Sequence, residues 1–211
     1  GDVRTVDDLT QHSTDIREPL AIPYHGHTIY QTGLPSQGVI HLEAMRICEE
    51  LLAPERFWTA DWIHTQIEAI KIAFADRLAY TQDPRFSPSL EANLLDDGWI
   101  AKRARTINPL AADAIQVPAM QDGDTTYLCV ADGSGMMVSL IQSVSNAFGS
   151  GVVAGDTGVV MNNRVGRGFT LDPASPNVYA PGKRTVHTLI ACSIADGDGT
   201  PIIVGGTPGG D

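Results

Sequence analysis

The sequence has few basic residues, few cysteines and no long apolar run. Its 14 Lys and Arg stand against 25 Asp and Glu, a formal net charge of −11. This balance argues against a nucleic-acid-binding protein, because neutralising phosphates requires basic patches. No apolar stretch approaches the roughly 18 residues of a transmembrane helix. The three cysteines, Cys48, Cys129 and Cys192, lie far apart in apolar contexts, which favours buried thiols over a disulfide with one free thiol.

The sequence also lacks the short motifs that mark many enzymes and metal sites. It has no HExxH, CxxC, GxxxxGK[ST] or GxSxG pattern. Residues 149–154 fit a GxGxx[GA] pattern, but the amphipathic helix that a dinucleotide site requires does not follow. Residues 122–124 and 196–199 resemble cation-binding loops without the closing glutamate. A surface loop explains His25 and His27 better than a shared metal does. We therefore expect neither a metal ion nor a cofactor.

At 211 residues the chain is long enough for one large domain or two small ones with a sizeable core. No signal peptide opens it, although Gly1-Asp2-Val3 is not a natural start and leaves a removed leader open. The sequence therefore does not give the compartment in which the protein works.

Helical patterns dominate the first 124 residues. After a strand over 27–32, a helix begins near Ser36, which we expect as its N-cap, and ends before Pro54. Two further helices are predicted over 61–81 and 97–107. The 61–81 helix carries one apolar stripe of the kind that faces a core: Ile63, Ile67, Ile70, Phe74 and Leu78. Residues 108–124 have no period and contain two prolines, which predicts a linker.

Strand patterns dominate the rest of the chain. Residues 125–211 are rich in Gly, Val, Thr and Ser and contain no convincing amphipathic helix. Besides a hairpin at the start of this part, strands are predicted over 152–153, 158–161, 188–195 and 201–204. We therefore predict an α+β protein in which residues 1–124 are mainly helical and residues 125–211 mainly β.

Residues 123–149 predict a β-hairpin with hydroxyl groups at its open end. The first strand is apolar throughout, which is typical of a strand buried on both faces. Asp132-Gly-Ser-Gly135 supplies the turn, and the second strand then returns antiparallel. The return brings Ser143 and Ser145 near the start of the first strand, where Thr125 stands. Thr125 is therefore the residue at which we look for chemistry.

A threonine hydroxyl is a poor nucleophile unless a base takes its proton. Cutting the chain between Asp124 and Thr125 would make the threonine's own α-amine that base, since an α-amine has a reference pKa of about 7.7–8.0. Such a site also needs an accessible preceding segment, hydroxyls that position the amine, and backbone N–H donors for the oxyanion. The linker, the two serines and the glycine-rich residues 205–210 can supply them. The alternative is that Thr125 is only a β-former with a local hydroxyl–backbone bond.

Three stretches carry a resemblance to a known family. They are residues 125–163, which begin TTYLCVADGSG and end VVMNN, the GKRTVHTL segment, and the terminal GGTPGGD. The PSQG and IKIAFADRLAY segments of the first half add to it. In these stretches, and over nearly all of its length, the chain resembles the γ-glutamyltranspeptidase family of N-terminal-nucleophile hydrolases. The resemblance implies an αββα sandwich, partial here, autoproteolysis before a threonine, and acyl transfer through a threonyl ester.

The resemblance assigns catalytic roles to single positions. Thr125 matches the nucleophile and new N-terminus, and Thr126 is its companion threonine. Ser143 falls where the family has a hydroxyl that contacts the nucleophile. Gly209 and Gly210 match the glycines of the oxyanion hole. These positions follow the family's pattern closely.

The substrate-binding positions depart from that pattern. Ser145 stands where an asparagine usually binds substrate, and His187-Thr188 where the transpeptidases have a Ser-Ser pair that grips the α-carboxylate. Arg164 and Arg167 replace a glutamine and an aspartate, of which the aspartate pairs with the glutamyl α-ammonium group. Because guanidinium repels ammonium, we expect glutathione to be a poor substrate and an acyl group with a distal carboxylate a better one. The departures resemble the branch labelled cephalosporin acylase-like. The alternative is that both arginines are solvated surface residues.

Two hypotheses of other classes stay open. Against the family, the early half of the large subunit and the final portion of the small subunit are absent. One alternative is therefore a truncated, unprocessed or non-catalytic remnant that only folds or associates. The other, a carbohydrate- or peptide-binding β-domain, has only the glycine-rich half in its favour. The expected partners are a γ-glutamyl or related carboxylate-bearing amide and the remaining parts of both subunits, with homo-oligomerisation left open.

Overall fold

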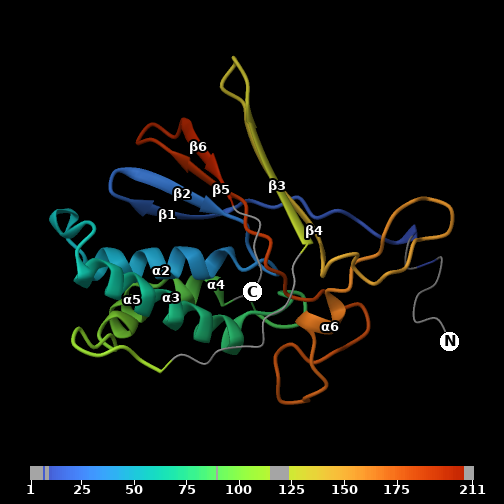
Figure 1. Cartoon of the computed structure of the whole chain (residues 1–211), viewed down its shortest axis with the longest axis horizontal. Helices are drawn as coiled ribbons and strands as arrows, with labels where there is room; N and C mark the ends of the chain where they lie inside the picture. The colour runs from blue at the N-terminus through green and yellow to red at the C-terminus, as the bar shows by residue number, and fades with distance from the viewer. Residues whose placement is uncertain (1–6, 8–9, 89, 115–123, 207–211) are drawn as a thin grey trace.

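The computed structural model describes residues 7, 10–88, 90–114 and 124–206. Its helices gather on one side of a four-stranded sheet, and a long β-hairpin extends away from both (Figure 1). Helix α2 (Gly38–Leu51) contacts the sheet, while α3 (Ala60–Tyr80) and α5 (Asp97–Ala104) pack against α2. Three shorter helices complete the described set: η1 (Pro54–Arg56), α4 (Glu91–Leu94) and α6 (Val165–Gly168). The three helices predicted in the first half are confirmed.

The start of α2 differs from the prediction. Gln37, not Ser36, is the N-cap, and it makes no side-chain capping bond. The Ser36 hydroxyl instead donates to the carbonyl of Leu189 and lies 2.9 Å from the Thr32 hydroxyl. Ser36 therefore joins the helix start to a distant segment, a long-range contact that no local pattern encodes.

The exposed face of α3 also differs from the prediction made from the sequence. The apolar stripe lies in solvent, with Ile67 47%, Ile70 49% and Leu78 74% exposed. The buried face is built from small and polar residues instead, including Ala69 and Ala73. Small side chains let two helices approach closely, so these alanines take the position against α2 and α5 that the stripe was expected to take. The core between the helices contains, among others, Val39, Ile40, Ile47, Ala69, Ala73, Leu94 and Ile100.

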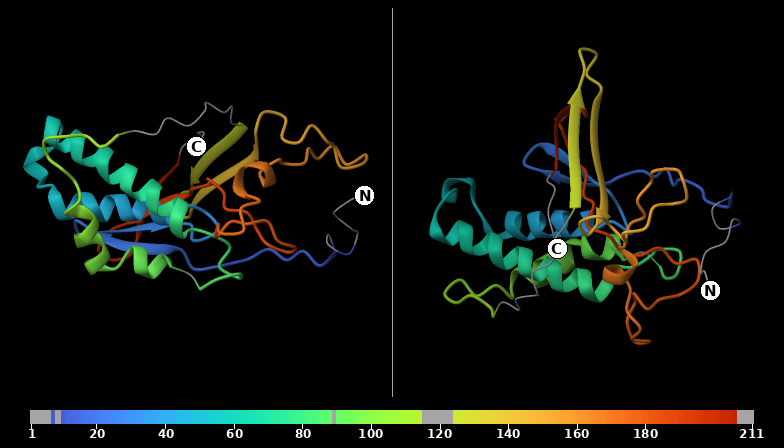
Figure 2. Two further views of the ribbon diagram at one scale, coloured as in Figure 1. Left: turned by 90° about the horizontal axis from the view of Figure 1, so that it is seen from below. Right: turned by 45° about the vertical axis from the view of Figure 1, so that its right-hand side comes forward.

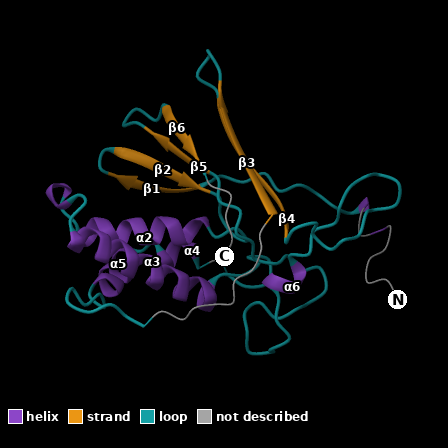
Figure 3. Cartoon of the chain, in the orientation of Figure 1, coloured by secondary structure: helices purple, strands orange, loops and turns teal. Residues whose placement is uncertain are grey.

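The four-stranded sheet joins the two halves of the chain (Figure 3). Strands β1 (Leu20–Tyr24) and β2 (His27–Gln31) form a hairpin, and β2 pairs antiparallel with β5 (Cys192–Ala195). β6 (Pro201–Gly205) pairs with β5 at the edge. The mixture of helices and antiparallel strands is the α+β class that the sequence predicts.

Other segments match the prediction only in part. Residues 152–161 form turns joined by a single bridge between Val153 and Val160, not two strands. The linker lies among the described residues only as far as 114, and there its backbone packs on α3, where Lys71 Nζ donates to the carbonyl of Asp113. All three cysteines are free, but only Cys48 is buried, and Cys129 is exposed.

A carboxylic acid lies fully buried between the helices. Glu43 of α2 is 0% exposed and accepts a hydrogen bond of 2.9 Å from the indole N–H of Trp99. Asp76 of α3 lies beside it and is held by the guanidinium of Arg103, whose Nε donates at 2.7 Å. Burial, followed by the neighbouring Asp76 carboxylate, raises the pKa of Glu43 to about 8. Glu43 is therefore protonated at pH 7 in the folded protein.

This buried acid makes stability depend on pH. Between the unfolded value near 4.5 and the folded value near 8, unfolding releases a proton, so the free energy of unfolding falls as pH rises through this window. Glu43→Gln keeps the shape of the protonated acid and should remove roughly 2–4 kcal/mol of that fall. Urea unfolding at pH 5.5, 7 and 8.5 measures it. Glu50→Gln, at an exposed position of the same helix, should retain the wild-type dependence. Equal slopes in Glu43→Gln and wild type would contradict the assignment.

Candidate active site

The predicted hairpin is present as β3 (Asp124–Ala131) and β4 (Met137–Ser145), and it projects from the rest of the molecule (Figure 2). Its turn is held by Asp132, whose Oδ1 accepts the backbone N–H groups of Ser134 and Met136 at 2.8 and 3.0 Å. The prediction that its first strand is buried on both faces is wrong, because Leu128 is 44% and Val130 57% exposed. Apart from the pairing of its own strands, the hairpin makes its main contacts with the edge strand β6.

Two hydroxyls meet at the open end of the hairpin. Thr125 and Ser143 are direct cross-strand partners, and the Thr125 hydroxyl donates to Ser143 Oγ at 2.9 Å. Ser143 Oγ also accepts the backbone N–H of Ser145 at 2.9 Å, which fixes its position. The register shifts between Asp124 and Thr125, so an irregularity of the ladder falls at this peptide bond. In the intact chain the nitrogen of Thr125 is an amide.

Ser145, opposite Asp124, has an unusual backbone and an unsatisfied hydroxyl. Its φ of 80° lies in the left-handed region, which costs energy for a residue with a side chain. Only 6% of the residue is exposed, and its Oγ has no hydrogen-bond partner among the described residues. A buried, unpaired hydroxyl beside Ser143 is a group that a bound molecule can satisfy.

The loop after the hairpin folds back onto its open end. Asn163 donates from its backbone to the carbonyl of Val144 at 3.2 Å, and its side-chain oxygen accepts from the Asn146 backbone at 3.0 Å. Arg167 then donates to Asn146 Oδ1 at 3.0 Å, one residue beyond Ser145. Arg164 donates from Nε to the carbonyl of Val186 at 3.1 Å. Both arginines are half-buried, so the description of them as solvated surface residues does not fit.

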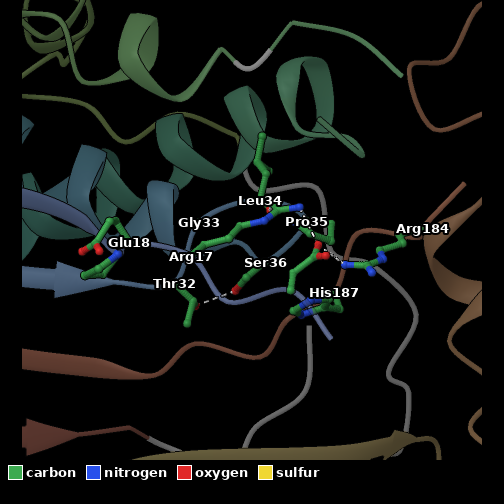
Figure 4. A pocket seen from close by; sticks show the side chains of 11 residues that line it. Arg17, Glu18, Thr32, Gly33, Leu34, Pro35, Ser36, Arg184 and His187 are labelled. Carbon is green, nitrogen blue, oxygen red and sulfur yellow. Dashed lines mark hydrogen bonds and ion pairs between the residues drawn. The ribbon is translucent and has the colours of Figure 1, made fainter. Parts of the chain in front are cut away.

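His187 follows Val186 and lies at the wall of a cavity (Figure 4). Its backbone N–H donates to the carbonyl of Pro35 at 2.9 Å, in a short parallel pairing with Ser36. Its Nδ1 is buried without a hydrogen-bond partner among the described residues. Burial, with the nearby charges of Arg164 and Arg184, lowers the pKa of His187 to about 4. The imidazole is therefore neutral at pH 7 and can accept or donate one hydrogen bond.

The cavity measures about 290 Å³ and combines residues from both ends of the chain. Arg17 donates to the carbonyl of Leu34 at 2.8 Å and to Asp15 at 2.6 Å, and Arg184 also pairs with Asp15. The two guanidinium groups thus share one carboxylate at the cavity rim. Thr32 and Ser36, whose hydroxyls lie 2.9 Å apart, also line the cavity.

The structure gathers some of the predicted residues and not others. Thr126 is exposed and pairs with Gln142, on the neighbouring position of the strand. Thr188 is half-buried beside His187. Gly209 and Gly210 lie outside the described residues, and Asp124 is described through its backbone pairing with Ser145. The oxyanion glycines and the cleavage site therefore remain predictions.

Sequence reasoning missed the two cavity arginines. Arg17 and Arg184 are separated by more than 160 positions, so no spacing brings them together. The position of Arg184, three residues before His187 in the GKRTVHTL segment, was the available signal. In the described part of the chain no cluster of three or more His, Cys, Asp or Glu residues gathers as a metal site. None of the described helices has the length and apolar character that crossing a membrane requires.

Comparisons with known proteins find similar sequences among proenzymes. The "Glutathione hydrolase-like YwrD proenzyme" of Bacillus subtilis (strain 168) is 37% identical over the whole chain, which spans 40% of that relative. The "Oxamate amidohydrolase proenzyme" of Klebsiella pneumoniae is 36% identical over 98% of the chain and 38% of the relative.

A solved cephalosporin acylase from Bacillus halodurans superposes with a TM-score of 0.81 at 36% identity, covering 94% of this chain and 35% of that one. This match confirms the α+β fold of the N-terminal-nucleophile hydrolases that the resemblance implies. The chain thus spans about 40% of the length of such relatives. The profile described as Gamma-glutamyltranspeptidase matches residues 1–211. The chain belongs to the γ-glutamyltranspeptidase family.

Proposed function

We propose that the protein is an N-terminal threonine hydrolase or acyltransferase that cuts its own chain between Asp124 and Thr125. The observation that carries this proposal is the 2.9 Å hydrogen bond from the Thr125 hydroxyl to Ser143, at the first residue after the proposed cleavage site. The bond holds the threonine oxygen in place, and a base must still take its proton before it attacks a carbonyl. The relatives named as proenzymes support processing of this kind.

The chemistry has two stages. In the first, Thr125 Oγ attacks the carbonyl of Asp124, the amide becomes an ester, and water releases the Asp124 carboxylate and a free α-amine on Thr125. In the second, that amine accepts the hydroxyl proton while Oγ attacks the amide carbonyl of a substrate. The departing amine leaves a threonyl ester, which water or a second amine resolves. Gly209 and Gly210 are the proposed donors to the oxyanion.

The substrate is an amide whose acyl group carries a carboxylate. Arg164 and Arg167 lie beside Ser145 and His187 and supply two positive charges, with Thr188 as a further donor. A fixed guanidinium group favours a carboxylate and repels the α-ammonium group of a γ-glutamyl donor. One relative is named for oxamate, itself an amide with a carboxylate. Glutathione or another γ-glutamyl amide is then the weaker member of the donor class.

A matched pair of chromogenic amides tests the proposal. Glutaryl p-nitroanilide and γ-glutamyl p-nitroanilide differ only in the α-ammonium group, and butyryl p-nitroanilide lacks the carboxylate as well. We expect kcat/KM for the glutaryl amide to exceed that of both others by about 10-fold or more. Equal or faster turnover of the γ-glutamyl amide, or of glutathione, would sink the assignment of the two arginines.

An unprocessed chain that only folds or associates is the second candidate. An intact Asp124–Thr125 bond favours this candidate, because the amide nitrogen of Thr125 cannot serve as the base. Intact mass under denaturing conditions separates the two candidates. Two pieces that divide before Thr125 support the enzyme, and a single undivided mass under all conditions supports the second candidate.

A further inference from the structure

A buried carboxylate outside the cavity holds the segment that carries His187. Asp83 follows the end of α3, is 0% exposed, and does not line the cavity. It does not close the helix either, because the Thr81 hydroxyl does so by donating to the carbonyl of Arg77 at 2.7 Å. Its bonds go elsewhere. Its Oδ1 accepts the backbone N–H of Arg85 at 3.0 Å and closes the local turn, while its Oδ2 reaches a distant segment.

Asp83 and Arg85 together form a clamp on the backbone around Lys183. The backbone N–H of Arg184 donates to Asp83 Oδ2 at 2.6 Å. The Arg85 guanidinium donates to both oxygens of Asp83, at 2.6 Å from one terminal nitrogen, and to the carbonyl of Gly182 at 2.9 Å. Burial alone would raise the pKa of Asp83, but these bonds outweigh it and lower the pKa to about 2. The clamp is therefore charged at every working pH.

The clamped segment, residues 182–188, contains the cavity wall. Arg184 and His187 both face the cavity in Figure 4. Further along, the carbonyl of Val186 accepts from Arg164, and the N–H of His187 donates to Pro35. The segment is thus held at several places, and the Asp83 bond is the one made by a carboxylate that is 0% exposed. Charge-assisted hydrogen bonds are about twice as strong as neutral ones.

We propose that Asp83 is a positioning residue that fixes residues 182–188 and so sets where His187 and Arg164, which bonds the carbonyl of Val186, meet the carboxylate of the substrate. The inference rests on the proposed function for its substrate, while the ordering of the segment stands on the bonds alone. Asp83 does not touch the substrate, so its loss should weaken binding of the carboxylate more than the acyl-transfer step.

Asp83→Asn and Arg85→Gln in the full-length protein test this role. In both, hydrogen exchange of peptides covering 182–188 should rise at least about 10-fold, while peptides from α2 keep their protection. The KM for glutaryl p-nitroanilide should rise about 10-fold with kcat changed less than about threefold, and butyryl p-nitroanilide should be affected less. Asp132→Asn, which removes another aspartate that accepts backbone N–H bonds, is the matched control and should change neither readout.

Two results would overturn the role of Asp83. Unchanged exchange at 182–188 in Asp83→Asn would show that the clamp does not order the segment. Equal losses for the glutaryl and butyryl amides, together with faster exchange throughout the protein, would show a general structural role. A wild-type protein that hydrolyses none of the amides would refute the proposed function, and the exchange measurement would still decide the clamp.

Discussion

Replacing Thr125 with alanine is expected to leave one uncut chain and to abolish amide turnover, by about 1,000-fold or more in kcat/KM. The Thr125 hydroxyl is the group that Ser143 contacts at 2.9 Å, and alanine removes both the attacking atom and the new N-terminal nucleophile. Intact mass measures the first effect and release of p-nitroaniline the second. Chain cutting and amide turnover should be lost together, because the Thr125 oxygen performs both reactions.

Two variants make this result specific. Thr125→Ser keeps a hydroxyl and should still be cut, although more slowly, since the methyl group that orients the oxygen is gone. Ser134→Ala changes a hydroxyl at the far turn of the same hairpin and should leave cutting and turnover as in wild type. Cleavage before residue 125 in the alanine variant would show that another group performs the reaction, and the assignment of Thr125 would be wrong.

The hairpin was predictable because its information is local. The turn at 132–135 and the strands on either side fix the register, and the register alone places Ser143 opposite Thr125. The strained Ser145 was not foreseen, since the bulge opposite Asp124 depends on how the loop through Asn163 returns to the hairpin. Local information thus places the proposed nucleophile opposite Ser143, and long-range contacts shape its surroundings.

The helices show the same division between what local sequence predicts and what long-range contacts decide. Prolines and periodicity located α2 and α3 well, but the side of α3 that would be buried was misjudged. Periodicity marks an apolar face without saying what lies against it, and here Ala69 and Ala73 pack on the neighbouring helices while Ile67 stays exposed. The cavity was beyond sequence reasoning for a related reason. Arg17 and Arg184 meet through Asp15, and β2 pairs with β5, contacts that join segments far apart in the chain.

Exchanging Arg164 and Arg167 for the residues of the glutathione-handling transpeptidases should reverse the preference for acyl donors. In Arg164→Gln with Arg167→Asp, the ratio of kcat/KM for glutaryl to γ-glutamyl p-nitroanilide is expected to fall about 100-fold. An aspartate in place of Arg167 attracts the α-ammonium group that the guanidinium repels. The same change places a negative charge where the glutaryl carboxylate should bind. Both effects lower the ratio, which is why the expected change is large.

The arginines also make structural bonds, and these need separate controls. Arg167 bonds Asn146, and Arg164 bonds the carbonyl before His187, so a loss of activity alone would not identify a charge effect. The ratio between two substrates on one variant cancels any general loss of active protein. Arg167→Lys keeps the charge and should keep the preference, whereas Arg105→Asp, at an exposed position after α5, should leave the ratio unchanged. If the double variant keeps the wild-type ratio, the two arginines hold the loop in place and do not choose the substrate.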